Sequence, residues 1–371
     1  MQKEEYKYLN AFRSLAPVGD KTLRLLLERF GSAEAAWKAS AVDFAAMPGI
    51  SKSAGEALAR RETLVNPEEA WELVEKAEIR MLREDDPLYP RVLREIPDRP
   101  LFLYVRGSYD WTREKPAIAI VGSRKFTHYG EQAAERLAYD LARAGCVIVS
   151  GLAFGIDKIA HTGALQADGE TLAVLAGGID DAGINPRSHV PLGKRILEAG
   201  ALVSEFPPGT IPLPAYFPMR NRIIAGISLG TLVIEAAEQS GSLITARLAL
   251  EYDREVFAVP GSIFSPASAG TNALLRSGAK AVTNVRDILE EFPLFSESGK
   301  TPGQAEAKPS LLLSEAEEKV LAALSHDPLH VDRIIKAARL GTIDVQSALT
   351  MLELKGIARN IGGMHYIRQY P

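Results

Sequence analysis

Four short turns rich in glycine and hydroxyl side chains follow aliphatic runs in the middle of the chain, and they could bind phosphate. Glycine lets the backbone approach a ligand closely, hydroxyl groups donate hydrogen bonds, and helix N-termini favour anions. A tight turn between a strand and a helix needs small residues in any case, but four such turns together predict a phosphate-binding rim. The candidate residues in these turns are Ser123, Arg124, Gly151, Gly155, Gly177, Gly178, Gly241, Ser242 and Thr245.

A second candidate segment runs from Tyr216 to Ile224 and combines aromatic, basic and amide side chains. Arginine neutralises backbone phosphates, asparagine can bind a base edge or a phosphate, and an exposed phenylalanine ring offers a face on which a base stacks. In an alternative, structural role, Phe217 and Ile223 belong to the core and the arginines pair with Glu205 or Glu235. The residues that would contact nucleic acid are Phe217, Arg220, Asn221 and Arg222.

Sequence patterns of cofactor sites and of common catalytic sites are missing from the chain. No G-x-G-x-x-G follows the first aliphatic run, Ser150 and Gly151 stand where an NAD site has an acidic residue, and no P-loop pattern occurs. The six histidines form no H-E-x-x-H, and Ser240 lacks the upstream glycine of a G-x-S-x-G turn. We therefore expect no cofactor, no metal and no catalytic residue.

The overall composition excludes several classes of protein. The 371 residues carry 43 basic and 47 acidic side chains, a net charge of -4, so any site for a polyanion must be local. No apolar run suits a signal peptide or a membrane span, and the lone Cys146 cannot form an internal disulfide. We expect a cytoplasmic protein of two or three domains without membrane contact. Cys146 should be buried and inert, and Asp157 should contact His161 across one helical turn.

From residue 117 onward, β-rich runs alternate with helical patterns, which is typical of a parallel α/β sheet. The runs look buried on both faces, as parallel strands are, and the ligands of such sheets bind outside the carboxyl ends of the strands. The turns described above would lie at that edge. The predicted strands are Ala117–Val121, Cys146–Ser150, Thr171–Ala176, Leu202–Glu205, Thr231–Ala236, Val256–Val259 and Ala281–Thr283.

The remaining segments divide the chain further. Residues 1–80 predict a helical domain, in which Gly19 and Gly49 each begin a turn followed by a helix, as in a helix-hairpin-helix. Such a glycine can bring backbone N–H groups to a phosphate, or the turn can simply pack. Residues 81–292 hold the sheet and open with a bridging stretch before the first strand. Residues 293–310 are rich in Gly, Pro, Ser and Lys and predict a flexible linker.

Residues 311–371 predict a winged helix, because three helical patterns precede a hairpin centred on Gly362-Gly363. The third helix carries Asp344 and Glu353, which make a poor surface for DNA phosphates. We therefore favour protein interaction or domain packing for this unit, and DNA binding stays the alternative.

Six segments of the chain, taken together and in their order, provide a basis for comparison with known protein families. They are YPRVLREIPDRPLFLYVRG (89–107), AIVGSRKFTHYG (119–130), SGLAFGIDKIAH (150–161), FPMRNRIIAG (217–226), VIEAAEQSGSLITARLA (233–249) and VFAVPGSIF (256–264). This series resembles the DNA processing protein DprA family. The resemblance implies an extended Rossmann-like domain that binds single-stranded DNA, dimerises, and helps load the RecA recombinase on incoming DNA during natural transformation. It also implies a helical, SAM- or helix-hairpin-helix-like N-terminal domain and a C-terminal winged helix.

The resemblance also assigns DNA contacts to individual residues. Family members often carry a Lys shortly before the Phe, whereas this chain has IPLPAY at residues 211–216. The loop GGIDDAGINPRSH after the third strand departs from the family segment, which usually continues with Asp, then Tyr-Pro, then Asn, and Asp180 and Pro186 keep that pattern only in part. The resemblance associates self-association with the region that holds Leu274 and Leu275. The matching DNA-binding positions are Ser123, Arg124, Gly151, Gly155, Phe217, Arg220, Asn221, Arg222, Gly241, Ser242 and Thr245.

An enzyme is the alternative from a different class. The segment VIEAAEQSGSLITA also resembles, more distantly, the phosphate loop of the lysine-decarboxylase-like nucleotide phosphoribohydrolases, which share a Rossmann-like architecture. Those enzymes need a Glu within this loop. Here Glu235 and Glu238 precede the glycine, and the next acidic residue after Thr245 is Glu251. The sequence therefore favours a single-stranded DNA-binding protein.

Overall fold

The structure is a computed structural model that describes residues 2–45, 47–292, 313–325 and 328–368. Its contacts divide the chain into two compact units, residues 1–297 and 298–371. The helices before residue 80 fall in the same unit as the sheet, so the predicted domain boundary there stays a prediction. The predicted linker, residues 293–310, lies outside the described residues. Among the described residues, every helix is too short or too polar to cross a lipid bilayer.

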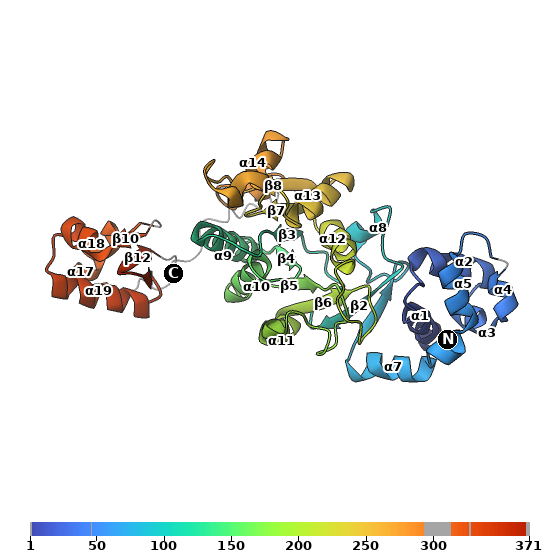
Figure 1. The fold of residues 1–371 in the computed structure, drawn as a ribbon. Coiled ribbons are helices and arrows are strands. Elements are labelled where there is room, and N and C mark those ends of the chain that lie inside the picture. Colours follow the sequence, from blue (N-terminus) through green and yellow to red (C-terminus); the bar gives the residue numbers. More distant parts are fainter. Residues whose placement is uncertain (1, 46, 293–312, 326–327, 369–371) are drawn as a thin grey trace. The chain divides into compact units, whose positions relative to one another are not determined.

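A nine-stranded sheet organises the first unit, with the order β1-β2-β6-β5-β4-β3-β7-β8-β9 (Figure 1). The pairs β1–β2 and β2–β6 are antiparallel, and all the other pairs are parallel. The strands are β1 (Arg80–Arg83), β2 (Phe102–Gly107), β3 (Ala117–Val121), β4 (Val147–Ser150), β5 (Thr171–Val174), β6 (Gly200–Ser204), β7 (Gly230–Val233), β8 (Glu255–Ala258) and β9 (Lys280–Ala281).

The predicted parallel α/β sheet is confirmed for β3 to β9, because all the pairs among these strands are parallel. Strands β3 to β7 are buried along their whole length as expected, whereas β8 begins with the exposed Glu255 and β9 is not buried. The sequence prediction missed β1 and β2, which lie in the stretch interpreted as a bridge. Both strands pair antiparallel through residues distant in the sequence, for example Tyr104 opposite Ser204. The sheet is therefore mixed, with an antiparallel edge.

Helices cover both faces of the sheet, and each face has its own apolar core. The cores on the two faces take alternate residues of the same strand, such as Ala119 on one side and Ile118 on the other. One face is covered by α8 (Arg91–Arg94), α12 (Tyr216–Gly226) and α13 (Ser242–Glu251). The other is covered by α9 (His128–Arg143), α10 (Ile156–Gln166), α11 (Val190–Ala199) and α15 (Arg286–Leu289). The segment η1 (Arg187–His189) precedes α11, and η2 (Pro266–Ser268) precedes α14 (Ala269–Arg276).

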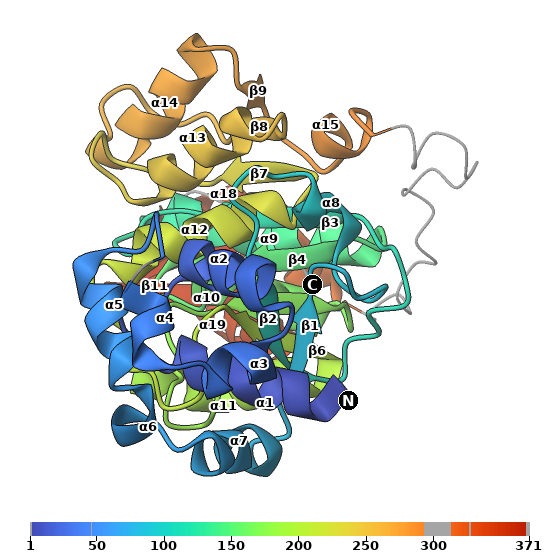
Figure 2. The same ribbon diagram turned by 90° about the vertical axis from the view of Figure 1, so that its right-hand side faces the viewer.

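The N-terminal helices pack beside the antiparallel edge and share a core with Met81, Phe102 and Tyr104 of β1 and β2. They and α14 lie at opposite ends of the sheet (Figure 2). Gly19 immediately precedes the second of these helices, and Gly49 lies shortly before the fifth. The N-terminal helices are α1 (Gln2–Arg13), α2 (Asp20–Phe30), α3 (Ala33–Lys38), α4 (Ala41–Ala45), α5 (Lys52–Ala59), α6 (Arg61–Leu64) and α7 (Pro67–Lys76).

The strand order reverses direction at β3, which pairs with β4 on one side and with β7 on the other. Loops that leave the carboxyl ends of adjacent strands diverge at such a point and open a crevice for a ligand. The turn Gly122-Ser123-Arg124 follows β3 directly. The topology therefore places the first predicted turn at the switch point.

The second unit has the three helices and the hairpin that the sequence predicts for a winged helix. Ser314 and Glu317 form a reciprocal capping box at the start of the first helix, and Val320, Ile334 and Leu349 are among its buried core residues. A short strand joins the hairpin in the order β10-β12-β11. The elements are α17 (Glu315–Ala323), β10 (Leu329–His330), α18 (Val331–Ala338), α19 (Thr342–Leu354), β11 (Ala358–Gly362) and β12 (His365–Arg368).

Candidate nucleic-acid interface

Two cavities lie at the carboxyl ends of the central strands, and both are lined by Arg124, Ala153 and Phe217. The larger measures about 860 Å³ and the smaller about 120 Å³. Neither is lined by Gly155 or Arg222. Of the predicted residues, the larger cavity is lined by Ser123, Arg124, Phe217, Arg220, Asn221, Gly241, Ser242 and Thr245, and the smaller by Arg124, Gly151 and Phe217.

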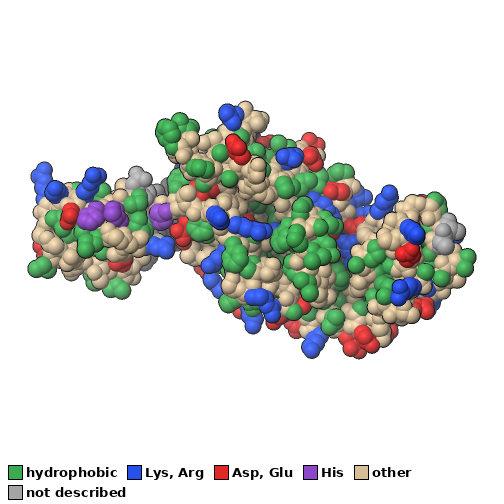
Figure 3. All heavy atoms as spheres, in the orientation of Figure 1, with side chains coloured by type: hydrophobic (Ala, Val, Ile, Leu, Met, Phe, Trp, Pro, Cys, Tyr) green, Lys and Arg blue, Asp and Glu red, His purple; other side chains and the backbone are tan. Residues whose placement is uncertain are grey.

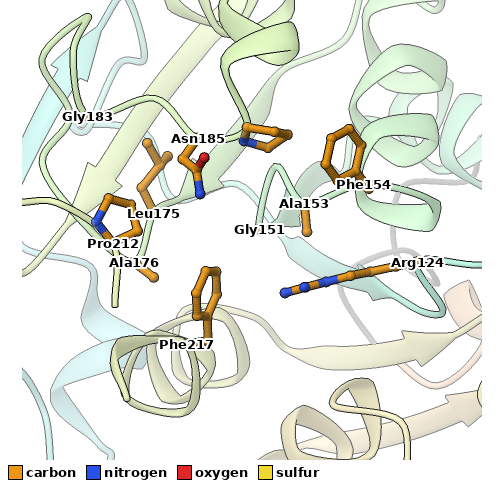
Figure 4. A pocket seen from close by; sticks show the side chains of 11 residues that line it. Arg124, Gly151, Ala153, Phe154, Leu175, Ala176, Gly183, Asn185, Pro212 and Phe217 are labelled. Carbon is orange, nitrogen blue, oxygen red and sulfur yellow. The ribbon is translucent and has the colours of Figure 1, made fainter. Parts of the chain in front are cut away.

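Arg124 and Phe217 meet where the two cavities adjoin. The Arg124 guanidinium lies over the Phe217 ring, 5.4 Å from its centroid, and the Arg124 side chain is exposed. Figure 4 shows Arg124, Phe217 and Asn185 directed toward the same space from different elements. Among the described residues, no carboxylate forms a salt bridge with Arg124. Its charge is therefore available to a ligand phosphate.

Arg220 lies beneath this surface rather than on it. Its side chain is 4% exposed, and Nη1 donates a hydrogen bond of 2.6 Å to the carbonyl oxygen of Val174. Burial lowers the pKa of Arg220, and the nearby Asp157 carboxylate opposes this shift. Gly151 packs directly on the guanidinium, because a Cβ at residue 151 would lie 1.8 Å from Nη1. Arg220 therefore supports the floor of the site.

The turn after β4 is held by a buried carboxylate. Asp157 accepts hydrogen bonds from the backbone N–H groups of Gly151, at 3.1 Å, and of Ala153, at 3.4 Å. Burial raises the pKa of Asp157, and Arg220 opposes that shift. Gly155 has φ +83°, and a Cβ there would lie 2.3 Å from the carbonyl oxygen of Ser123. In this structure, Gly151 and Gly155 therefore allow close packing of the turns against Arg220 and Ser123. The role predicted for both glycines was contact with a phosphate.

Arg222 points away from both cavities. It forms a buried salt bridge with Glu205, and its Nη1 donates a hydrogen bond of 2.6 Å to the carbonyl oxygen of Asp98. The phosphate contact predicted for Arg222 is not supported by this geometry, because its charge is already neutralised inside the protein. The structural alternative, pairing with Glu205, describes Arg222.

Glu235 pairs with neither arginine and instead holds the first turn. Its carboxylate accepts hydrogen bonds from the Thr127 backbone N–H, at 2.9 Å, and from Thr127 Oγ1, at 2.6 Å. The Ser123 hydroxyl donates to the carbonyl oxygen of Lys125 at 2.5 Å and accepts from the Lys125 N–H at 3.0 Å. The hydroxyl therefore shapes the turn that presents Arg124.

The turn Ser240-Gly241 and the first residues of α13 line the larger cavity. Ser242 Oγ lies 2.7 Å from Ser240 Oγ, and Thr245 is buried. Gly241 is exposed, and a Cβ there would meet no heavy atom within 4 Å among the described residues. The two hydroxyl residues shape this wall, and Gly241 leaves it open.

Of two further predictions, the contact between Asp157 and His161 is wrong and the burial of Cys146 is confirmed. The expected contact between Asp157 and His161 is wrong, because His161 Nδ1 lies 2.7 Å from Thr171 Oγ1 on the neighbouring strand. Burial lowers the pKa of His161 to about 3, so the ring stays neutral. Cys146 is buried as expected, and burial raises the pKa of its thiol to about 12.

The residues at the cavities that were not predicted as contacts include Lys125, Phe154 and Asn185. Lys125 lines the larger cavity and directly follows Arg124 in the sequence, so its position was a usable signal. Phe154 is half exposed at the smaller cavity and meets the edge of the buried His189 ring at 4.9 Å. Asn185 comes from the altered loop after β5, and no sequence pattern pointed to it.

Comparison with known proteins identifies the family. Residues 80–293 match the family described as DNA recombination-mediator protein A, and residues 304–364 match the DprA winged helix domain. The chain belongs to the DNA recombination-mediator protein A family. The resemblance found in the sequence is thereby confirmed.

Individual members of this family cover much or all of the chain. Protein Smf of Synechocystis sp. is 32% identical over 400 residues and covers 100% of both chains. DNA processing protein DprA of Bacillus subtilis is 46% identical over 205 residues, which are 55% of this chain and 68% of that protein. The crystal structure of DprA from Streptococcus pneumoniae matches with a TM-score of 0.65 at 34% identity, over 79% of this chain and 98% of that one. A DprA structure from Helicobacter pylori matches with a TM-score of 0.52 at 30% identity, over 58% and 95%.

Proposed function

We propose that this protein binds single-stranded DNA, without chemical turnover, at the two cavities that adjoin Arg124 and Phe217. The observation that carries the proposal is the exposed Arg124 guanidinium lying over the Phe217 ring. A base that stacks on Phe217 would displace the Arg124 guanidinium from the ring, and the guanidinium would then bind the adjoining phosphate. A base inside a duplex is already stacked and paired, so an unpaired strand suits this arrangement better.

The related structure from Helicobacter pylori supports the proposal, because it concerns the single-stranded DNA binding mode of that DprA. The curated relatives from Bacillus subtilis and Streptococcus pneumoniae are named DNA processing proteins. We further propose that this protein acts in the cytoplasm as a dimer and helps load RecA on incoming strands during natural transformation. The contact set proposed here keeps Arg124, Phe217 and Asn221 and adds Lys125.

Binding of one labelled oligonucleotide, single-stranded or annealed to its complement, tests the proposal at matched salt. We expect tighter binding of the single strand, and equal affinity for both forms would contradict the stacking argument. A nucleoside-monophosphate hydrolysis assay addresses the phosphoribohydrolase alternative, since release of free base would require turnover. RecA filament assembly on strands coated with single-strand-binding protein tests loading, and an unchanged assembly rate would contradict it.

A further inference from the structure

A buried network of charges connects the N-terminal helices to α12, the helix that carries Phe217. Glu205, at the end of β6, is 1% exposed and forms salt bridges with Arg13 of α1 and Arg222 of α12. Arg13 Nη2 lies 3.2 Å from Glu205 Oε1, and Arg13 Nε donates to the Glu205 carbonyl oxygen at 2.9 Å. One carboxylate thus joins two arginines from segments about 200 residues apart in the sequence.

Both arginines have a second anchor. Arg13 Nη1 lies 2.9 Å from Asp20 Oδ1, and the other oxygen of Asp20 accepts a hydrogen bond from the Leu101 N–H at 3.0 Å. Arg222 donates to the Asp98 carbonyl oxygen, which lies before β2. The network therefore fixes α1, the entry to β2 and α12 against one another.

Burial makes this network sensitive to the loss of any member. The Arg13 and Arg222 side chains are 7% and 12% exposed, so water cannot replace a missing partner easily. Removing one partner of a buried pair leaves an uncompensated charge, which the structure relieves by moving. The segments free to move in response are α1, the entry to β2 and α12, which the network joins.

Helix α12 depends on residues 205 and 206 at two points. The Phe206 ring stacks on Tyr216 in the first turn, with ring centroids 4.4 Å apart, and Glu205 binds Arg222 one and a half turns later. No side chain caps the start of α12. The end of β6 therefore contributes two contacts to the position of α12 and of Phe217, which follows Tyr216.

The geometry points to Arg222 and Arg13 as positioning residues for single-stranded DNA binding. Arg13 lines neither cavity and acts through Glu205 and Arg222 on the placement of Phe217. This inference rests on the proposed function, and it makes the N-terminal helices necessary for full DNA affinity without any DNA contact from Arg13.

The test compares Arg13→Met with Lys7→Met in the full chain. Lys7 is a matched control because it lies on the same helix, is 7% exposed, and pairs with Glu4 and Glu68 inside the helical segment. Two quantities are measured for each variant: hydrogen exchange of the backbone amides of residues 216–226 in the absence of DNA, and affinity for a single-stranded oligonucleotide as a function of salt.

We expect Arg13→Met to speed exchange in residues 216–226 and to weaken binding roughly three- to tenfold, as for residues coupled through a shared network. The salt slope should stay unchanged, because no phosphate contact is lost. Arg222→Met should do the same, and the two changes combined should cost less than the sum of their separate effects. If Arg13→Met does not fold, Arg13→Lys replaces it, with a smaller effect in the same direction.

Equal effects of Arg13→Met and Lys7→Met on exchange and affinity would overturn the inference, because general destabilisation would then explain both. A lowered salt slope in Arg13→Met would also overturn it, since Arg13 would then act as a phosphate contact. If the unaltered protein does not bind single-stranded DNA, the proposed function fails, and the exchange measurement alone still decides whether Arg13 positions α12.

Discussion

Replacing Arg124 by alanine tests the site most directly, because the structure distinguishes three arginines that look alike in the sequence. Arg124 is exposed over Phe217, whereas Arg220 is buried beside Asp157 and Arg222 is neutralised by Glu205. Of the three, only Arg124 can offer its charge to a phosphate without breaking a hydrogen bond or salt bridge to another described residue. We therefore expect Arg124→Ala to change the salt dependence of binding and Arg222→Met to leave it unchanged.

The magnitude follows from counterion release. Each phosphate contact on a single strand contributes about 0.7 to the slope of log affinity against log salt. Loss of one contact should therefore lower the slope by about 0.7 and weaken binding roughly fivefold at about 0.1 M salt. Extrapolated to about 1 M salt, the two proteins should converge, because this ionic contribution vanishes there.

Fluorescence anisotropy of a labelled single strand, titrated at four or more salt concentrations, measures this slope. Arg143→Ala is the matched control. Arg143 is also exposed, but it is the last residue of α9, a helix of 16 residues, so it lies far along the helix from the turn that carries Arg124. A slope that Arg124→Ala leaves unchanged would refute the assignment, and so would an equal change in Arg143→Ala. A large slope change in Arg222→Met would show that its pair with Glu205 opens in the complex.

Four further predictions concern separate parts of the molecule. Phe217→Leu should weaken single-strand binding by about 1–3 kcal/mol with an unchanged salt slope, since only stacking is lost; titration of the variant beside the unaltered protein checks this. A chain ending at Glu291 should keep single-strand affinity within a few-fold, and a tenfold loss in a folded fragment would make the winged helix a DNA-binding module. Light scattering should give the mass of a dimer at tens of micromolar, and Leu275→Arg on α14 should yield monomers; a monomeric unaltered chain would contradict the dimer. Burial lowers the pKa of His161 from its usual 6.5 to about 3, so between pH 6.5 and 3 the unfolded chain binds a proton at this residue and the folded chain does not. Lowering the pH from 7 to 5 should therefore reduce the free energy of unfolding by about 2 kcal/mol. Urea titrations check this, because the His161→Gln variant should lack this part of the pH dependence.

The central sheet could be predicted from the sequence because each buried parallel strand has a recognisable apolar run. A strand covered on both faces is a nearly continuous apolar run, as in Ala117–Val121, so it can be recognised without knowing which strand it pairs with. Strands β1 and β2 could not be recognised from their own sequence in this way. Strand β1 pairs only with β2, and the pairing of β2 with β6 depends on a contact across about 100 residues, which local patterns do not reveal.

The roles of the arginines could not be predicted in the same way. Arg220 and Arg222 are two residues apart on α12, so they leave the helix about 200° apart and point in nearly opposite directions. Which of them faces the cavity depends on where Glu205 and Asp157 come to lie, and both carboxylates belong to other strands and helices. The sequence supplied Glu205 as an alternative partner, and only the fold selects it.

The charges around the cavities determine what kind of binding this site can support. Among the described residues that line the cavities, the cationic side chains are Arg124, Lys125 and Arg220, and Arg220 is buried. Basic and acidic side chains are interspersed over the face in Figure 3, in keeping with the net charge of -4. Two available charges give a salt slope of only about -1.4 for a single strand. Most of the affinity must then come from contacts that salt does not screen, above all stacking on Phe217, so binding should persist at salt concentrations that release proteins with a broad basic groove.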